Sequence, residues 1–347
     1  MKQTWLAKHA MRRWIARALQ LVNGRRDGCA RFDGDPQSVA ILVPHGWGDA
    51  TLMTPLLRNL RQRFPGVEIH IVAFSDPAVG FFRADPNVTA VYRARHDPLP
   101  YAAAVFGRRF DVLFNPKDHV SATFLLHSTL MRARFKVGHD DPFHRGLFDR
   151  LITMEYHCNM ALKNCALLAA LGQPVAPNEC RPYLPPMPVT PAVRACAARM
   201  EPERSIIGLN ISAGAQARYW TDEKWAALAS RFPDRRFMVF SAPQDAAARH
   251  AVEATGTNIL PSPATGNLYE VGLLVARLGL LVTPDTSLVH VASCTNTPVV
   301  GLYGNTLKDR SCFGPFMVPH ELVASPTPRV ADIALEDVVD AVARLTA

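Results

Sequence analysis

"VAILVPHGWGDATLMTP", residues 39–55, is the stretch of sequence that decides the fold of the first half of the chain. Residues 39–43 are a short apolar run rich in β-branched side chains, which predicts a buried strand. Residues 50–63 have the composition of a helix. Two glycines and Asp49 stand where the strand gives way to the helix, as in the repeats that build a parallel sheet.

The alternation of strands and helices continues along the chain. In the first half, further strands are expected at 67–74, 88–92 and 110–114, and helices at 77–83, 98–108, 119–133 and 157–172. The second half has expected strands at 205–212, 235–242, 258–260, 278–285 and 298–304, helices beginning at Thr221, Pro243, Asn267 and Thr286, and a last helix at 335–345. This alternation predicts an α/β protein of two Rossmann-like halves, each a parallel sheet covered by helices on both faces.

A proline-rich segment separates the two halves. Residues 174–202 hold eight of the 28 prolines. Proline fixes φ and continues neither a helix nor a central strand. We therefore expect a linker at 174–203 between domains at 37–173 and 204–347, with residues 1–36 as an N-terminal extension.

Composition excludes several classes of protein. The seven cysteines are scattered without a CxxC pair, which argues against a disulfide framework and a zinc site and fits a reducing cytosol. Of the net charge of +8, residues 1–36 carry +5, from eight Lys or Arg and three Asp. No basic face with interleaved aromatic side chains is evident, so no nucleic-acid partner is expected. The chain also lacks an apolar run of about 20 residues and a signal-peptide cleavage site.

Residues 4–22 have the pattern of a basic amphipathic helix. At about 100° per residue, one side is apolar and the other polar. The apolar side holds Ala7, Ala10, Met11, Trp14, Ile15, Ala18, Leu21 and Val22, and the polar side holds His9, Arg12, Arg13, Arg17 and Gln20. Two interpretations stay open: a helix lying on an anionic membrane surface, or a helix packed on the protein with its charged face in water.

The turn at residues 45–49 carries the first candidate for chemistry. Thr51 occupies the place of the third glycine of a dinucleotide fingerprint, and the chain has no P-loop motif, so a nicotinamide or P-loop site is weakly supported. Asp49, at the mouth of a helix expected to begin near residue 50, is either a helix cap or a reactive carboxylate. Backbone N–H groups and the helix dipole are expected to keep its pKa low. Trp47 is expected to border a pocket.

Two further loops each follow a predicted strand. In "VTPDTSLVHVAS" (282–293), Asp285, Thr286 and Ser287 open a helix whose N–H groups and hydroxyls suit a phosphate, and His290 lies on the same face as Thr286. Asp285 as a plain cap and His290 as a core histidine are the alternatives. In the loop at 212–220, Ser212 and Gly214 allow close approach of a diphosphate, and Arg218 offers it a permanent charge.

Together these loops carry a family resemblance. From about residue 39 to 345 the chain resembles the ADP-heptose:lipopolysaccharide heptosyltransferases, inverting glycosyltransferases of the GT-B fold. Five motifs in the family's order carry it: GDATLMTPLLRNLRQRFP (48–65), YHCNMALKNCALLAALG (156–172), ARYWTDEKWAAL (217–228), FSAPQDAAAR (240–249) and TPDTSLVHVASCTNTPVVGLYGNT (283–306). The last is similar to the family's nucleotide-sugar signature.

The resemblance implies roles for individual residues. Asp49 matches the proposed general base. The donor is implied to be bound by Ser212, Gly214, Arg218, Asp245, Asp285, Thr286, Ser287 and His290, with Asp245 near the ribose. Trp47, Lys117 and Lys136 are the candidates for binding the acceptor. Ser287, Arg218 and Asn305 replace the usual glycine, lysine and proline, and these departures bear on the identity of the sugar.

The implied function is inverting transfer of a heptose from a nucleotide-diphosphate donor, with ADP-heptose leading, to a lipopolysaccharide-core or similar glycan acceptor. The first domain would take the acceptor and the second the nucleotide sugar, with no cofactor and no metal. The expected location is cytoplasmic, peripheral on the inner face of the inner membrane, with residues 4–22 as the membrane contact. The alternatives are a nucleotide-sugar epimerase, a member of the family with another donor or acceptor, a non-catalytic sugar-nucleotide binder and a nicotinamide oxidoreductase.

Overall fold

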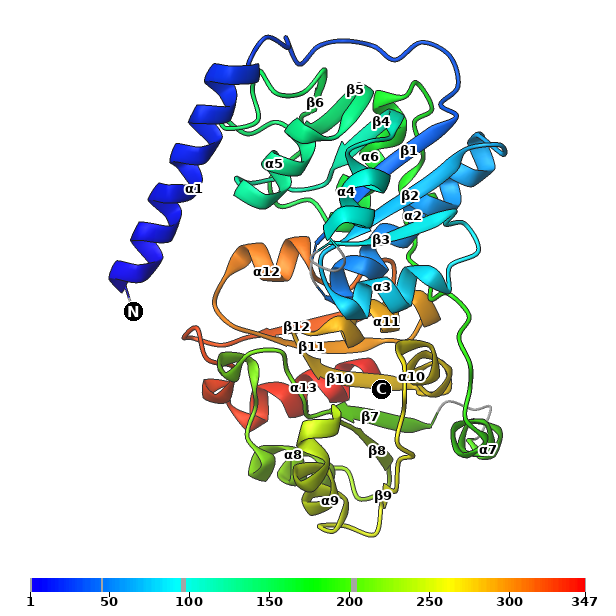
Figure 1. Cartoon of the computed structure of the whole chain (residues 1–347). Coiled ribbons are helices and arrows are strands. Elements are labelled where there is room, and N and C mark those ends of the chain that lie inside the picture. Colours follow the sequence, from blue (N-terminus) through cyan, green and yellow to red (C-terminus); the bar gives the residue numbers. More distant parts are fainter. Residues whose placement is uncertain (1, 45, 95–97, 201–204, 347) are drawn as a thin grey trace. The chain divides into compact units, whose positions relative to one another are not determined.

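The chain folds into two compact units, residues 1–180 and 181–347. The computed structural model describes residues 2–44, 46–94, 98–200 and 205–346, and it gives side chains from residue 10 onward (Figure 1). Each unit contains one six-stranded sheet in which all neighbouring strands are parallel. The prediction of two Rossmann-like α/β halves is confirmed.

Unit 1, residues 1–180, has its strands in the order β3-β2-β1-β4-β5-β6. The strands are β1 Ser38–Val43, β2 Glu68–Ala73, β3 Ala90–Arg93, β4 Arg109–Asn115, β5 Arg132–His139 and β6 Arg150–Ile152. The helices are α1 Lys2–Asn23, α2 Trp47–Arg63, α3 Asp76–Arg83, α4 Pro98–Val105, α5 Ala122–Leu130 and α6 Met160–Ala170. All six residues of β1 are buried, as expected of a central strand covered on both faces.

Unit 2, residues 181–347, has the strand order β12-β11-β10-β7-β8-β9. Its strands are β7 Ile206–Asn210, β8 Arg236–Phe240, β9 Ile259–Leu260, β10 Leu280–Pro284, β11 Val299–Tyr303 and β12 His320–Ala324. Its helices are α7 Pro191–Arg199, α8 Asp222–Ser230, α9 Ala246–Glu253, α10 Leu268–Val275, α11 Ser287–Thr295, α12 Leu307–Cys312 and α13 Leu335–Thr346. The rings of Trp220 and Trp225 pack edge to face in the core of unit 2, with their centres 4.9 Å apart. They anchor the end of the loop that follows β7.

The order of the strands reverses once in each sheet, and this reversal determines where a ligand can bind. In unit 1 the chain runs outward from β1 through β2 and β3, and then from β4 through β5 and β6 on the other side. In unit 2 the reversal lies between β7 and β10. The loops at the carboxyl ends of the two central strands diverge at such a point and leave a crevice between them.

The proline-rich segment is more structured than a linker. Its first part includes a short 3-10 helix, Pro177–Cys180, where Glu179 pairs with Arg63 of α2 at 2.7 Å. Its second part includes α7, for which Thr190 is the N-cap, and the Thr190 N–H donates to Glu270 at 2.5 Å. The chain therefore passes from one unit to the other at residues 180–181, and the residues on either side pack on their own unit.

Some elements differ from the predictions. The helix expected at 119–133 ends at Leu130, and the unpredicted strand β5 begins at Arg132. The charged residues in "RARFKVGH" hid this strand, because Arg132 and Arg134 at its beginning are exposed. The strands β6 and β12 and the helix α12 were also unpredicted. Thr221 is the N-cap of α8, as predicted.

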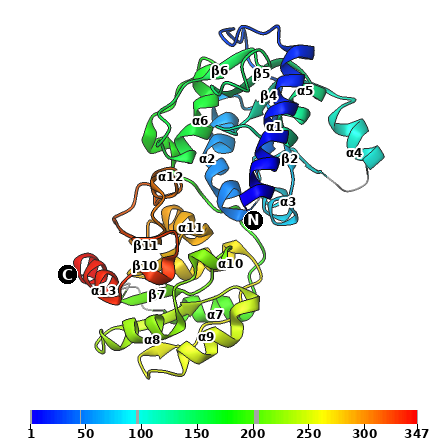
Figure 2. The ribbon, with the colours of Figure 1, turned by 90° about the vertical axis from the view of Figure 1, so that its left-hand side faces the viewer.

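Helix α1 packs on unit 1, but not through the side expected from its sequence pattern. Ala16 is fully buried with Leu125 of α5 and Phe148, and Gln20 donates to two carbonyl groups of the loop at 142–145. Trp14, by contrast, is 71% exposed. Figure 2 shows the helix lying along the outside of the unit. Within the described residues, no helix has both the length and the apolar content needed to cross a membrane.

Candidate functional site

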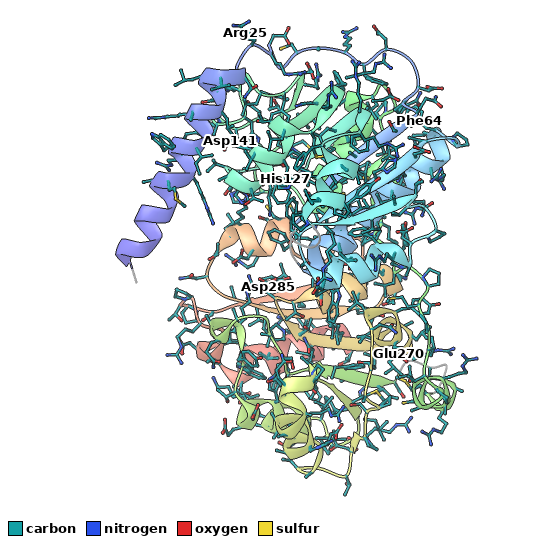
Figure 3. The ribbon with its side chains drawn as sticks, viewed as in Figure 1. Arg25, Phe64, His127, Asp141, Glu270 and Asp285 are labelled. Atoms are coloured by element: carbon teal, nitrogen blue, oxygen red, sulfur yellow. The ribbon has the colours of Figure 1, made fainter. Side chains whose placement is uncertain are left out.

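In unit 2 the predicted donor-site residues come together where the strand order reverses. Arg218 belongs to the loop after β7. Asp285, which is labelled in Figure 3, follows the last residue of β10. The Arg218 guanidinium lies 3.2 Å from the Asp285 carboxylate, and it also donates to the Asp285 carbonyl oxygen at 3.1 Å. The arginine side chain is 42% exposed, so part of its charge remains accessible to an anionic ligand.

Burial determines the chemistry of Asp285. Desolvation raises the pKa of its carboxyl group to about 6, with a smaller rise from Asp309, while the charge of Arg218 lowers it. The interpretation of Asp285 as a plain helix cap is wrong, because Thr286 is the N-cap of α11 and its hydroxyl accepts from the Leu288 N–H at 3.2 Å. Asp285 therefore lies just before the helix and faces Arg218.

A small hydrogen-bond network holds the amino end of α11 in place. The side-chain amide of Asn210, the last residue of β7, donates to the hydroxyls of Thr286 at 3.1 Å and Thr283 at 2.9 Å. Ser287 is the first residue of the helix and is half-buried. The network joins the two central strands across the reversal point. Our sequence analysis missed Asn210, whose position at the end of "SIIGLN" was the available signal.

A second group of hydrogen bonds orders the other side of the crevice. The Ser212 hydroxyl donates to the Asp245 carboxylate at 2.5 Å, and the Tyr219 hydroxyl donates to the same oxygen at 3.0 Å. The Ser212 oxygen in turn accepts from the Ala242 N–H at 2.7 Å. Gly214 is exposed, and a Cβ at this position would have no neighbour within 4 Å. This loop leaves open space around its backbone.

His290 is the fourth residue of α11. It is buried in α11, and burial lowers the pKa of its imidazole to about 4, so the ring is neutral at neutral pH. Its Nδ1 has no hydrogen-bond partner among the described residues. The structure thus favours the interpretation of His290 as a core histidine over direct contact with a donor.

In unit 1, Asp49 lies in the first turn of α2, above the carboxyl end of β1. The helix begins at Trp47, earlier than predicted, and its N-cap is Gly46. Gly46 has φ 103° and ψ 160°, a conformation open essentially only to glycine. Asp49 is therefore the third residue of the helix, and the interpretation of Asp49 as the helix cap is wrong. Trp47 is 42% exposed beside it.

The expectation of a low pKa for Asp49 is also wrong. Burial raises the pKa of its carboxyl group above the ordinary value for aspartate, and the charges of Lys117 and His119 oppose this rise. Both of these residues lie in the loop after β4, the second central strand of unit 1. The reversal between β1 and β4 therefore brings one carboxylate and two basic side chains to the same crevice.

Further contacts fix the loop that carries Lys117. Its ammonium lies 5.6 Å from the centre of the Phe124 ring, and the side chain is half-buried. The adjacent Asp118 pairs with His119 at 2.9 Å and with the buried Lys163 at 2.8 Å. Lys117 is thus a half-buried cation whose charge acts on Asp49.

The prediction of Lys136 as an acceptor-binding residue is wrong. It lies within β5 and is buried, and its ammonium donates to the carbonyl oxygens of Ser128 at 2.6 Å and Thr129 at 3.2 Å, in the last turn of α5. Burial lowers its pKa to about 8. The ammonium thus bonds carbonyl groups at the end of α5 that lack a partner within the helix. Across the described ranges, no three His, Cys, Asp or Glu side chains are grouped as metal ligands.

The chain is similar to known proteins in sequence and in fold. The family model described as glycosyltransferase family 9 (heptosyltransferase) matches residues 101–336. Lipopolysaccharide heptosyltransferase 3 of Escherichia coli is 21% identical over 285 residues, which are 75% of this chain and 81% of that protein.

Solved structures give the same result for the fold. A family 9 glycosyltransferase from Veillonella parvula is similar with a TM-score of 0.70 at 17% identity, over 91% of this chain and 98% of that one. The E. coli heptosyltransferase WaaC, solved with ADP, has a TM-score of 0.67 at 15% identity, over 89% of this chain and 99% of that one. WaaC was also solved with ADP-2-deoxy-2-fluoro heptose, with the same TM-score. The fold is that of the GT-B heptosyltransferases.

Proposed function

Because this chain belongs to glycosyltransferase family 9, the heptosyltransferases, we propose that it transfers a heptose from ADP-heptose to a lipopolysaccharide-core acceptor with inversion at the anomeric carbon. The observation that carries the proposal is the pairing of Arg218 with Asp285 in front of α11. A partly exposed guanidinium beside the amino end of a nine-residue helix favours a diphosphate. ADP-heptose is the leading donor because a related enzyme was solved with a close analogue of it.

We propose that unit 2 binds the nucleotide sugar through its diphosphate. Arg218 and the N–H groups at Thr286 and Ser287 would face the phosphate oxygens. They stabilise the negative charge that grows on the departing ADP, the type of interaction that contributes most to such transfers. Asp245, held by Ser212 and Tyr219, would accept from a ribose hydroxyl.

Unit 1 would supply the general base. The acceptor hydroxyl gives its proton to the Asp49 carboxylate while its oxygen bonds to the anomeric carbon, and the bond from that carbon to the diphosphate oxygen breaks. A raised pKa makes Asp49 a better proton acceptor than an ordinary aspartate, because general-base efficiency grows as the pKa approaches the working pH. Attack from the side opposite the leaving group inverts the anomeric carbon. In this mechanism no metal takes part.

The acceptor would bind to unit 1 beside the base. Lys117 and Trp47 are the proposed contacts, the first for an acidic or phosphorylated group of the glycolipid and the second for the face of a sugar. A glycolipid acceptor places the protein at the inner face of the inner membrane, as a peripheral protein of the cytoplasm.

The proposal is tested by direct assay. The protein is incubated with ADP-heptose and heptose-deficient lipopolysaccharide, and both released ADP and the anomeric configuration of the product are measured. We expect transfer with inversion, unchanged after treatment with a chelator. Epimeric sugar released without acceptor would instead indicate an epimerase. A thermal-shift panel of ADP-, GDP- and UDP-sugars identifies the nucleotide.

Arg218→Ala tests the observation that carries the proposal. It should weaken donor binding at least tenfold, since one charge-assisted contact is lost. Arg249→Ala is a matched control, because this arginine of α9 pairs with Glu253 of the same helix. Unchanged donor affinity in Arg218→Ala would remove this residue from the donor site.

A further inference from the structure

Helix α1 presents an apolar face to solvent. Four large apolar side chains are mostly exposed: Met11 at 57%, Trp14 at 71%, Leu21 at 90% and Val22 at 77%. At about 100° per residue these four side chains fall within roughly 100° of the helix circumference. They therefore lie on one side of the helix, which we call the α1 apolar face.

The exposure of this face follows from how the helix is held. Ala16 lies almost opposite this face and is fully buried against Leu125 and Phe148. Gln20 is on the same docked side and donates to the carbonyl groups of Pro142 at 2.9 Å and Arg145 at 3.0 Å. The helix is thus fixed to unit 1 by a side that includes Ala16, Leu19 and Gln20, and the four exposed apolar side chains point outward.

The charge around this face indicates its partner. Residues 1–26 contain seven Lys or Arg and no Asp or Glu. Arg12 and Arg17 are exposed, and Arg17 borders the α1 apolar face. Apolar side chains that include a tryptophan, bordered by arginines, suit the surface of an anionic bilayer, where the apolar groups enter the headgroup region and the arginines meet lipid phosphates.

The position of α1 relates this face to the acceptor. The guanidinium of Arg13 lies 5.9 Å from the centre of the Phe143 ring, in the loop that leaves the carboxyl end of β5. The strands β5 and β4 are parallel neighbours, so their carboxyl ends lie at the same edge of the sheet as Lys117 and Asp49. Helix α1 therefore reaches the edge of unit 1 that holds the proposed base.

We propose that the α1 apolar face docks unit 1 on an anionic bilayer and holds its acceptor edge beside the membrane. For the role of the acceptor this inference rests on the proposed function, whereas the docking itself does not. The face would act as a permanent surface anchor that raises the local concentration of a lipid-embedded acceptor.

The test is flotation of the full chain with vesicles of phosphatidylcholine containing phosphatidylglycerol, compared with vesicles of phosphatidylcholine alone. We expect binding to the anionic vesicles that weakens with added salt. The double variant Leu21→Asp/Val22→Asp should lose at least tenfold in partition coefficient. Leu99→Asp is the matched control, since Leu99 on α4 is 82% exposed, and it should bind as the unmodified chain does.

Two further variants separate the apolar contribution to vesicle binding from the charged one. Trp14→Ser removes one apolar side chain without adding charge, and Arg12→Gln/Arg17→Gln removes charge without changing the apolar face. Each should weaken binding, and the second should also reduce its salt dependence. Equal vesicle binding by all variants would overturn the proposal. So would a chain that ignores vesicles but sediments as a dimer that Leu21→Asp/Val22→Asp converts to a monomer.

Activity separates this inference from the proposed function. With a delipidated, soluble acceptor, Leu21→Asp/Val22→Asp should transfer sugar at the rate of the unmodified chain. With the acceptor embedded in anionic vesicles its KM should rise at least tenfold and its kcat should stay unchanged. Vesicle binding without any transfer would refute the function and leave the docking surface standing.

Discussion

At the scale of single residues, burial and the neighbouring charge of Lys117 determine how basic the Asp49 carboxylate is. Asp49 stands in the first turn of α2, where the helix terminus stabilises its charge. Burial nevertheless raises its pKa, and the charges of Lys117 and His119 oppose that rise. The carboxylate is therefore a stronger base than a solvated aspartate, and the charge of Lys117 partly offsets this increase.

Asp49→Asn should lower the rate of sugar transfer by about 10²- to 10⁴-fold, because the amide cannot accept the proton of the acceptor hydroxyl. Donor affinity should stay within twofold, since the proposed donor site lies in unit 2. The measurements are kcat and a binding isotherm for ADP-heptose. Asp76→Asn is the control, because Asp76 opens α3 at the same edge of the sheet. Full activity in Asp49→Asn would end the assignment of the base.

The pH dependence of transfer should show the raised pKa of Asp49. A carboxylate acts as a base only when ionised, so the rate falls as the pH drops through its pKa. This acidic limb should lie above the ordinary range for aspartate. Lys117→Met should move it to still higher pH, because the positive charge that lowers the pKa is lost. A limb that stays in place in Lys117→Met would show that another group controls the rate.

At the scale of secondary-structure elements, the caps and the reversal of strand order place the site. Helix α11 begins at Ser287 because the Thr286 hydroxyl satisfies a free N–H group of its first turn. The same hydroxyl accepts from Asn210 of the neighbouring central strand. One side chain thus fixes both the start of the helix and its position over the sheet.

Thr286→Val should lower the free energy of unfolding by about 1 kcal/mol, the usual cost of a lost N-cap, and should also weaken donor binding. Thr190→Val is the matched control, because Thr190 is the N-cap of α7 in the same unit. It should cost similar stability and leave donor affinity unchanged. Chemical denaturation and ADP binding are measured for both variants, and equal donor affinities in the two would contradict the proposed role of α11.

At the scale of the whole molecule, the chain consists of two units, each with its own sheet and its own core. The proposed base and the proposed donor-binding groups come from different units. Asp49 belongs to the first, and the pair of Arg218 and Asp285 to the second. This division is the physical reason to expect binding and proton transfer to be separable by mutation.

Hydrogen exchange measured with and without ADP should show which of the two units binds the nucleotide. ADP stabilises the folded state that binds it, by about 2.7 kcal/mol at a hundred times its Kd. Protection should increase in the loops at 211–220 and 285–290 and much less around Asp49. The same pattern is expected in Asp49→Asn. Protection confined to unit 1 would place the nucleotide there and contradict the proposed donor site.

The sequence by itself determined the two α/β halves, the strand–turn–helix units and the loops that carry the site. These depend on local patterns: apolar runs for buried strands, and caps such as Thr221 for helices. It placed Arg218 and Asp285 in separate loops after strands, and the parallel fold brings the ends of such strands together.

Only the tertiary structure decided what depends on burial and on distant neighbours. The raised pKa of Asp49 depends on desolvation and on a loop almost 70 residues away, which no local pattern encodes. Lys136 has the same charge as Lys117, yet it is buried against α5, because it lies within β5, a strand that the sequence pattern did not predict. The side of α1 that packs was decided by Ala16 and Gln20 rather than by the apolar stripe, since docking depends on the shape of the surface that receives the helix.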